Sequence, residues 1–266
     1  MAKFYSDLGR SWVINRLRVN AWYYRRRFPI FGGSGAPCRV AIKPPFAAKE
    51  TQIRFEEQED AIQALSIFRD GNAWNQLNLK TDPETIVDLG ANRGFSTLFW
   101  RCRFPNAQLH GIEMNADSIK RCRRLFADNQ LPGTFHQVAI GDRDGTLRFR
   151  PHASHTRHRL EKLLSAEEQE HSYQGGAVEV PCLTLGSFLR KQGIERVDLL
   201  KVDIEGAEQF LLETVESWAG AVRLVLLEIH HNIDVEWARA QLLKAGFSID
   251  LGDTTNRTEW WCQRNG

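Results

Sequence analysis

The hydrophobic residues of the chain follow two alternating patterns from residue 84 onward. Short apolar runs suit buried strands, and the segments between them repeat their apolar positions at helical spacing. These patterns predict strands at 86–89, 108–113, 134–140, 197–202 and 223–229, and helices at 96–102, 117–128, 208–215 and 235–245. Strands that alternate with helices are typical of an α/β fold with a mostly parallel, doubly wound sheet.

Two further stretches modify this simple alternation. Strand patterns at 146–149 and 177–183 flank a polar stretch at 151–176. At the end of the chain, 247–251 and 259–263 are separated by a polar turn and predict a hairpin. A terminal hairpin of this kind places an antiparallel last strand on the parallel sheet.

The first part of the chain predicts a separate cap, residues 1–80, in front of a main domain at 81–266. Within 1–30, seven basic residues and one acidic residue give a charge of +6, and aromatic residues lie between the arginines. A helix of this composition can pack on the main domain or make a peripheral contact with an anionic membrane surface. Residues 31–45 predict a linker, and 50–55 and 58–68 predict an edge strand and a helix.

Composition places the chain among ordinary globular proteins. It has 266 residues, of which 42% are hydrophobic and 26% charged, with a net charge of +2. There is no apolar run long enough to cross a bilayer and no secretory signal pattern. The five cysteines include no Cys-x-x-Cys pair, so free thiols in a reducing cytoplasm are expected.

The turn after the first strand of the main domain carries candidate cofactor contacts. Its residues are Asp88, Gly90, Asn92, Gly94 and, at the start of the next helix, Ser96. The spacing Asp-x-Gly-x-x-x-Gly departs from the Gly-x-Gly-x-x-Gly fingerprint of dinucleotide binding, in which the second glycine admits a pyrophosphate. The turn therefore favours S-adenosylmethionine, which has one nucleoside and no pyrophosphate, over NAD.

A carboxylate at the end of the next strand supports the same cofactor. Glu113 ends the strand at 108–113, where ligands of open α/β sheets bind, and it can accept both ribose hydroxyls. The alternative is a surface glutamate that caps the helix beginning near Asn115 or Asp117. Ala139 falls where it can line an adenine slot, although small apolar residues are equally normal in a core.

Three segments together resemble the FkbM family of S-adenosylmethionine-dependent methyltransferases. They are IVDLGANRG at 86–94, VDLLKVDIEGAE at 197–208 and VLLEIH at 225–230, and the resemblance covers about residues 50 to 250. It implies a Rossmann-like class I methyltransferase fold and O-methylation, which in this family often acts on sugar or polyketide hydroxyls. The expected acceptor is a hydroxyl of a saccharide or small metabolite.

The candidate catalytic residues are Asp203, Glu205 and His231, which follow two strands at the edge where the sulfonium is expected. Asp203 can orient the acceptor, and Glu205 can act as a base or join Asp203 in binding a divalent metal. In the alternative, Glu205 and Glu208 only begin a helix, and His230 and His231 are solvated. The stretch 151–176, with four histidines, predicts a lid over the acceptor that brings basic groups for a negatively charged substrate.

Two other functions fit parts of the sequence. A nucleic-acid methyltransferase would carry an Asn/Asp-Pro-Pro-aromatic tetrad where this chain has Asp203-Ile204-Glu205-Gly206, so no nucleic-acid partner is expected. A non-catalytic protein with the same fold could dock a partner through its basic N-terminus. The intact Asp88, Gly90, Gly94 and Glu113 argue against a decayed site.

Overall fold

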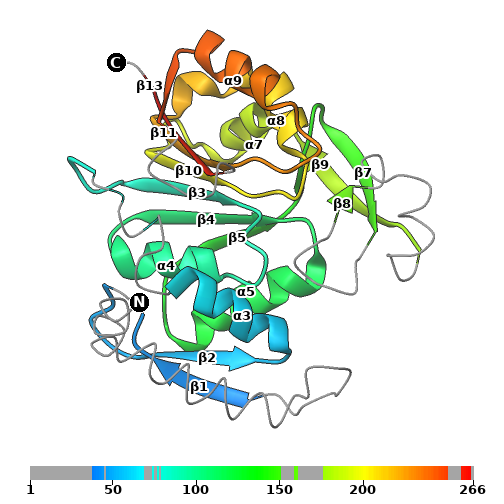
Figure 1. The fold of residues 1–266 in the computed structure, drawn as a ribbon. Helices are drawn as coiled ribbons and strands as arrows, with labels where there is room; N and C mark the ends of the chain where they lie inside the picture. Colours follow the sequence, from blue (N-terminus) through cyan, green and yellow to red (C-terminus); the bar gives the residue numbers. More distant parts are fainter. Residues whose placement is uncertain are drawn as a thin grey trace, which may run out of the picture.

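The structure is a computed structural model that describes residues 38–44, 46–68, 74, 77, 79–150, 159–160, 176–250 and 259–264. The predicted basic helix at 1–30 lies outside these residues, as do the histidines of the predicted lid. Among the described residues, no helix combines the length and apolar character needed to cross a bilayer. Figure 1 shows the arrangement of the elements around a central sheet.

The central sheet has seven strands. They are β3 (Thr85–Leu89), β4 (Gln108–Glu113), β5 (Thr134–Gln137), β10 (Leu199–Val202), β11 (Leu224–Glu228), β12 (Phe247–Asp250) and β13 (Glu259–Arg264). Their order is β12-β13-β11-β10-β3-β4-β5, and β13 runs antiparallel to both of its neighbours. The predicted parallel sheet with an antiparallel last strand is therefore confirmed.

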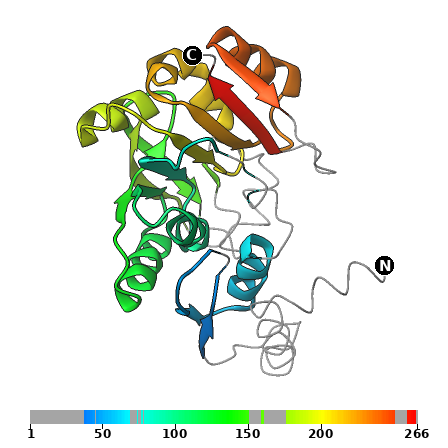
Figure 2. The same ribbon diagram turned by 90° about the vertical axis from the view of Figure 1, so that its left-hand side faces the viewer.

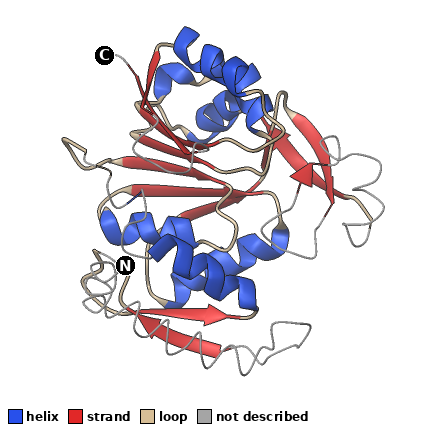
Figure 3. Ribbon diagram, viewed as in Figure 1, coloured by secondary structure: helices blue, strands red, loops and turns tan. Residues whose placement is uncertain are grey.

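Helices cover both faces of this sheet (Figure 3). On one face lie α4 (Phe95–Arg103) and α5 (Ala116–Asp128), and on the other lie α7 (Leu185–Gln192), α8 (Glu208–Glu213) and α9 (Val235–Lys244). Two short 3₁₀ turns, Val215–Ser217 and Ala219–Ala221, follow α8. Neighbouring residues of β3, Ile86 and Val87, belong to opposite hydrophobic clusters because successive strand side chains point to opposite faces.

The cap elements pack on the α4 side of the sheet. A hairpin of β1 (Cys38–Ile42) and β2 (Thr51–Phe55) is followed by α3 (Gln58–Phe68), and Figure 2 shows them at the opposite end of the molecule from the C-terminal hairpin. Ile53 and Phe68 share one hydrophobic cluster with Phe99 of α4. The helix at 58–68 is confirmed, but the prediction of a linker throughout 31–45 was wrong. Residues 38–42 form a strand because β2 pairs with them.

A second sheet stands beside the first. It has the order β6-β9-β7-β8, formed by β6 (Ala139–Ile140), β9 (Val178–Leu183), β7 (Gly145–Arg150) and β8 (Arg159–Leu160). The single strand predicted at 134–140 is thus divided, because β5 pairs with β4 while β6 pairs with β9. Helix α7 was missed, although Thr184 caps its first turn and Gly193 ends it in a left-handed conformation.

Two stacked histidines on adjacent strands make the main sheet sensitive to acid. His110 Nδ1 and His136 Nε2 lie 3.2 Å apart, and the edge of the Phe188 ring faces His136. Burial, followed by the charges of His110 and Arg123, lowers the pKa of His136 to about 4. Burial also lowers the pKa of His110. Both imidazoles therefore resist protonation in the folded protein.

We expect the free energy of unfolding to decrease as the pH falls from about 6.5 toward 4, because the unfolded chain then binds protons that the folded chain refuses. His136→Gln should flatten this dependence. Urea unfolding at pH 7 and pH 5 would measure it, with the exposed His231 replaced by Gln as a control. Equal losses of stability in wild type and His136→Gln would contradict the assignment.

Candidate active site

The turn after β3 is pressed against the end of β10. Gly90 has φ +77°, and a Cβ atom there would lie 1.7 Å from the Asp203 carbonyl oxygen. The amides of Gly90 and Ala91 donate to the Ile112 carbonyl at the end of β4. One turn thereby holds the carboxyl ends of three adjacent strands together. This close approach is the physical reason for glycine at position 90.

Two predicted cofactor contacts lie outside the cavities at this edge. Asp88 is 1% exposed and accepts hydrogen bonds from Ser96 Oγ (2.7 Å) and Thr97 Oγ1 (2.6 Å). Gly94 packs against Cys122 of α5 at the start of α4. The prediction of direct contact is therefore corrected for both residues. Asp88 positions α4 on its strand, and the Ser96 hydroxyl is engaged in that task.

Glu113 has the surroundings expected of a ligand-binding carboxylate. Its Oε2 accepts the amide of Asn92 at 3.1 Å, and its Oε1 accepts the amide of Asn115 at 2.8 Å. Burial raises its pKa, while these hydrogen bonds and Lys201 oppose that effect. The cap of α5 is Asn115, whose side chain accepts the amides of Asp117 and Ser118, so Glu113 is not the helix cap.

Two cavities meet beside the Gly90 turn. The first has an empty volume of about 700 Å³, which includes space open to solvent. The second has an empty volume of about 850 Å³. Both are lined by Gln63, Gly90, Asn92 and Asp203. The first also includes Glu113, Glu205 and the apolar side chains of Ile112, Met114, Val138, Ala139 and Ile140. Ala139 is thus one of the residues that line the first cavity.

A buried ammonium group stands behind the junction of the cavities. Lys201 is 2% exposed, and its Nζ lies 3.4 Å from Asp88 Oδ1, 3.4 Å from Asp203 Oδ2 and 3.2 Å from the Gly90 carbonyl oxygen. Burial by itself lowers the pKa of Lys201, but Asp203 and Asp88 raise it above its ordinary value overall. Lys201 is therefore protonated at neutral pH and holds the carboxylate of Asp203 in place.

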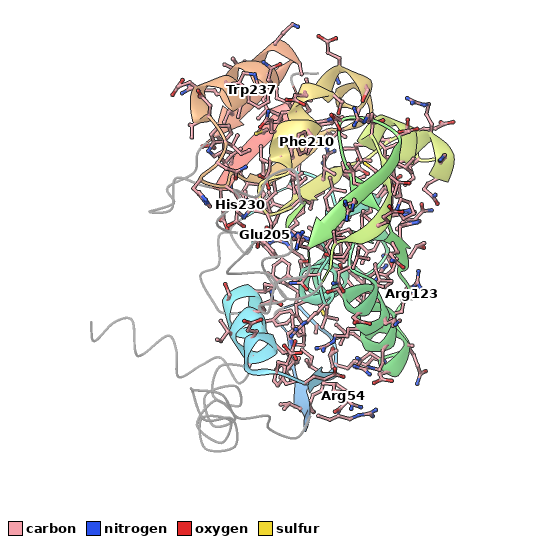
Figure 4. The ribbon with its side chains drawn as sticks, turned by 90° about the vertical axis from the view of Figure 1, so that its right-hand side faces the viewer. Arg54, Arg123, Glu205, Phe210, His230 and Trp237 are labelled. Atoms are coloured by element: carbon pink, nitrogen blue, oxygen red, sulfur yellow. The ribbon has the colours of Figure 1, made fainter. Side chains whose placement is uncertain are left out.

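The loops after β10 and β11 bring three candidate catalytic groups together. His230 Nε2 lies 3.6 Å from Glu205 Oε2 and 3.9 Å from Asp203 Oδ1, and Figure 4 shows Glu205 beside His230. The predicted His231 is exposed, and its neighbour His230 is the histidine that lies beside the two carboxylates. The two histidines differ because β11 ends at Glu228 and the chain turns directly after it.

Glu208 supports His230 and the loop that carries Glu205 from the interior of the protein. It is fully buried, and its Oε1 contacts His230 Nδ1 at 3.0 Å and accepts the amides of Ile204 (3.2 Å) and Gly206 (3.3 Å). Burial opposes protonation of His230, but Glu208, Asp203 and Glu205 raise its pKa to about 9. The alternative drawn from the sequence was that Glu205 and Glu208 only begin a helix. In the structure Glu208 also contacts His230 and the loop that carries Glu205.

The cap is tied to the site by a guanidinium group that the sequence analysis did not single out. Arg93, in the turn after β3, is 3% exposed and pairs with Asp60 and Glu57 of the cap. Gln63 of α3, one helical turn beyond Asp60, lines both cavities. No local pattern marks Arg93, because its partners lie more than 30 positions away.

The strand order, the antiparallel β13 and the helices on both faces define a Rossmann-like class I methyltransferase fold. A family model described as the methyltransferase FkbM domain matches residues 88–249. The chain therefore belongs to the FkbM methyltransferase family and is a methyltransferase, as the resemblance predicted.

Two relatives, one fungal and one bacterial, agree with this assignment. The chain is 31% identical to methyltransferase sdnD of Sordaria araneosa over 234 residues, which are 75% of this chain and 86% of that protein. It is 25% identical to the 31-O-demethyl-FK506 methyltransferase FkbM of Streptomyces tacrolimicus, over 60% of this chain and 69% of that protein. A crystal structure of methyltransferase FkbM from Methylobacillus flagellatus KT matches with a TM-score of 0.45 and 15% identity, over 75% of this chain and 47% of that one. This chain thus spans about half of that protein's length.

The effect of the close contact at Gly90 on stability can be measured separately from the effect of its backbone strain. Gly193 has a similar φ of +66° but no atom within 4 Å of an added Cβ. We expect Gly193→Ala to cost about 1–2 kcal/mol of stability through strain alone. Gly90→Ala should cost more and should also weaken cofactor binding, because it displaces Asp203. Thermal unfolding and calorimetry would measure the two effects, and equal behaviour of both variants would refute the importance of the contact.

Proposed function

We propose that the chain is an S-adenosylmethionine-dependent O-methyltransferase that acts on a hydroxyl of a saccharide or small metabolite. The observation that carries the proposal is the cavity between Glu113 and Asp203, which joins an apolar slot to the carboxylates of Asp203 and Glu205. The relative 31-O-demethyl-FK506 methyltransferase FkbM and the 2-O-methyltransferase NoeI of Sinorhizobium fredii have names that describe O-methylation.

The residues of the first cavity fit the adenosine half of this cofactor. The carboxylate of Glu113 accepts backbone amides, and its two oxygens offer about four acceptor positions, so it retains capacity for a ribose hydroxyl. Ile112, Val138 and Ala139 offer apolar surface to an adenine ring. S-adenosylmethionine supplies a methyl group on a sulfonium, and Gly90 and Asn92 lie where the cavities join to support its methionine half.

Methyl transfer requires the acceptor oxygen to be held in line with the sulfonium and to lose its proton. Asp203 lies at the junction of the cavities, with one carboxylate oxygen directed to Lys201 and the other toward His230. Asp203 orients the acceptor, and Glu205 and His230 form the polar surroundings of its hydroxyl. Lys201 holds Asp203 in place and, because it is itself protonated, does not serve as the base.

The charge of the second cavity favours a neutral acceptor. Glu228 and Glu259 are directly paired across β11 and β13, and both line this cavity with Asp203. Burial and Asp203 raise the pKa of Glu228 to about 7 and also raise the pKa of Glu259. The basic groups Lys201 and Arg93 are paired with carboxylates. Such a wall disfavours phosphates and supports a hydroxyl-bearing metabolite over a nucleic acid.

Replacing Glu113 tests the cofactor site. Glu113→Ala should weaken binding of S-adenosylmethionine by about 1.5–3 kcal/mol, the range for hydrogen bonds to a charged group. Isothermal titration calorimetry measures the change, with the exposed Glu213→Ala as the matched control. An unaltered affinity in Glu113→Ala would remove this residue from the site.

Replacing Asp203 tests the chemistry. The wild-type protein is first incubated with isotopically labelled S-adenosylmethionine and extracts of glycans and small metabolites, and mass spectrometry identifies the methylated hydroxyl. Asp203→Asn should then reduce turnover by roughly 10²-fold, the order of loss expected when an acceptor is misplaced, with a much smaller change in cofactor affinity. The exposed Asp117→Asn should retain the wild-type rate. Labelled products methylated only on nitrogen would overturn the proposed O-methylation.

A further inference from the structure

The group formed by Asp203, Glu205 and His230 has the composition of a metal site. One ligand atom from each residue lies within 4.8 Å of the others. The three residues come from two loops, the first after β10 and the second after β11. The two carboxylate oxygens are donors that suit Mg²⁺ and Mn²⁺, and the imidazole nitrogen adds a donor of the kind that first-row transition ions take, whereas thiolates, which select softer ions, are absent from this cluster.

The separations of these atoms suit a small divalent cation. Metal–ligand bonds of about 2.1 Å in an octahedron place neighbouring ligand atoms about 3.0 Å apart. His230 Nε2 lies 3.6 Å from Glu205 Oε2 and 3.9 Å from Asp203 Oδ1, so each of these two pairs needs to close by less than 1 Å, and the two carboxylates lie within 4.8 Å of each other. Rotation of the half-buried carboxylate side chains is sufficient for this movement.

The support behind the group is independent of the ligand atoms themselves. Glu208 contacts His230 Nδ1 and directs Nε2 toward the two carboxylates. The same oxygen accepts the amides of Ile204 and Gly206, which flank Glu205 in the other loop. Asn232 Nδ2 also donates to the Gly206 carbonyl and links the two loops again. A carboxylate behind a histidine is the usual outer partner of a metal-binding imidazole.

Four carboxylates gather at this position around Lys201 and His230, so negative charge is in excess among the described residues. Asp88, Asp203, Glu205 and Glu208 are four carboxylates, and the ammonium of Lys201 lies between two of them. Asp203 uses Oδ2 for Lys201, which leaves Oδ1 on the side of His230. The buried Oε2 of Glu208 has no hydrogen-bond partner among the described residues. Half-buried negative charge of this density is costly unless it is compensated.

We propose that Asp203, Glu205 and His230 bind one divalent cation of the Mg²⁺ or Mn²⁺ class, with Glu208 as the residue that positions His230. The role of this cation in methyl transfer rests on the proposed function. Its remaining coordination positions would take water and the acceptor oxygen. The bound cation would lower the pKa of the acceptor hydroxyl, so that its proton passes to solvent more readily. The acceptor oxygen forms its bond to the methyl carbon as the carbon–sulfur bond breaks, and sulfur keeps that electron pair as a neutral thioether.

Binding of Mn²⁺ to the chelator-treated, full-length protein tests the site without an acceptor. Loss of the electron paramagnetic resonance signal of free Mn²⁺ should give one site per chain, and an excess of Mg²⁺ should displace it. His230→Ala and Glu205→Gln should each weaken Mn²⁺ binding at least tenfold. Glu208→Gln should weaken it roughly 10–100-fold, as outer-shell changes do. The matched control is His231→Ala, which should bind Mn²⁺ as the wild type does.

Circular dichroism and affinity for S-adenosylmethionine verify that each variant is folded, and Glu205→Gln, in a half-buried loop, serves if His230→Ala does not fold. Absence of Mn²⁺ binding in the wild type, or equal binding in wild type and Glu205→Gln, would overturn the metal site and leave His230 as an ion-pair partner. If Mn²⁺ binds but S-adenosylmethionine does not, the proposed function fails and the metal site stands. If methyl transfer is undiminished after chelation and no Mn²⁺ binds, the metal site fails and the proposed function stands.

Discussion

The site depends on one buried cation, the ammonium group of Lys201. It is removed from water between the ends of β3 and β10 and is compensated by Asp88 on one side and Asp203 on the other. Loss of one partner from a buried ion pair leaves an uncompensated charge and commonly costs about 3–5 kcal/mol. This requirement fixes the rotamer of Asp203 at the point where the two cavities meet, whatever ligand occupies them.

A second constraint acts on the opposite side of Asp203. A single oxygen of Glu208 contacts the imidazole of His230 and accepts two amides of the loop that carries Glu205. Glu205 itself has φ +54°, a conformation that a non-glycine residue adopts at a cost of order 1–3 kcal/mol and that persists only where the surroundings enforce it. The groups proposed to act on the acceptor are therefore held in place before any substrate arrives, an arrangement that leaves little reorganisation for catalysis.

The cap participates in this arrangement through the turn after β3. Arg93 leaves that turn to pair with Asp60 and Glu57, and α3 then presents Gln63 to both cavities. The fold of the main domain is common to many methyltransferases, so the surfaces added to it have the greater freedom to select an acceptor. The cap and the acidic pair Glu228 and Glu259 are the described surfaces best placed to do so.

The sequence by itself determined the class of the fold and the family. Alternating apolar runs and helical periods predicted the central strands and helices to within a few residues, because these patterns are local and each buried strand needs them. The motifs around Gly90 and Asp203 identified the correct edge of the sheet. Tertiary structure decided which side chains act there. His230 rather than His231 reaches the carboxylates, Asp88 lies beneath the turn, and residues 38–42 form a strand, since each outcome depends on partners distant in the chain. Spacing along a sequence specifies which strand end a residue follows, but only packing specifies which way its side chain points.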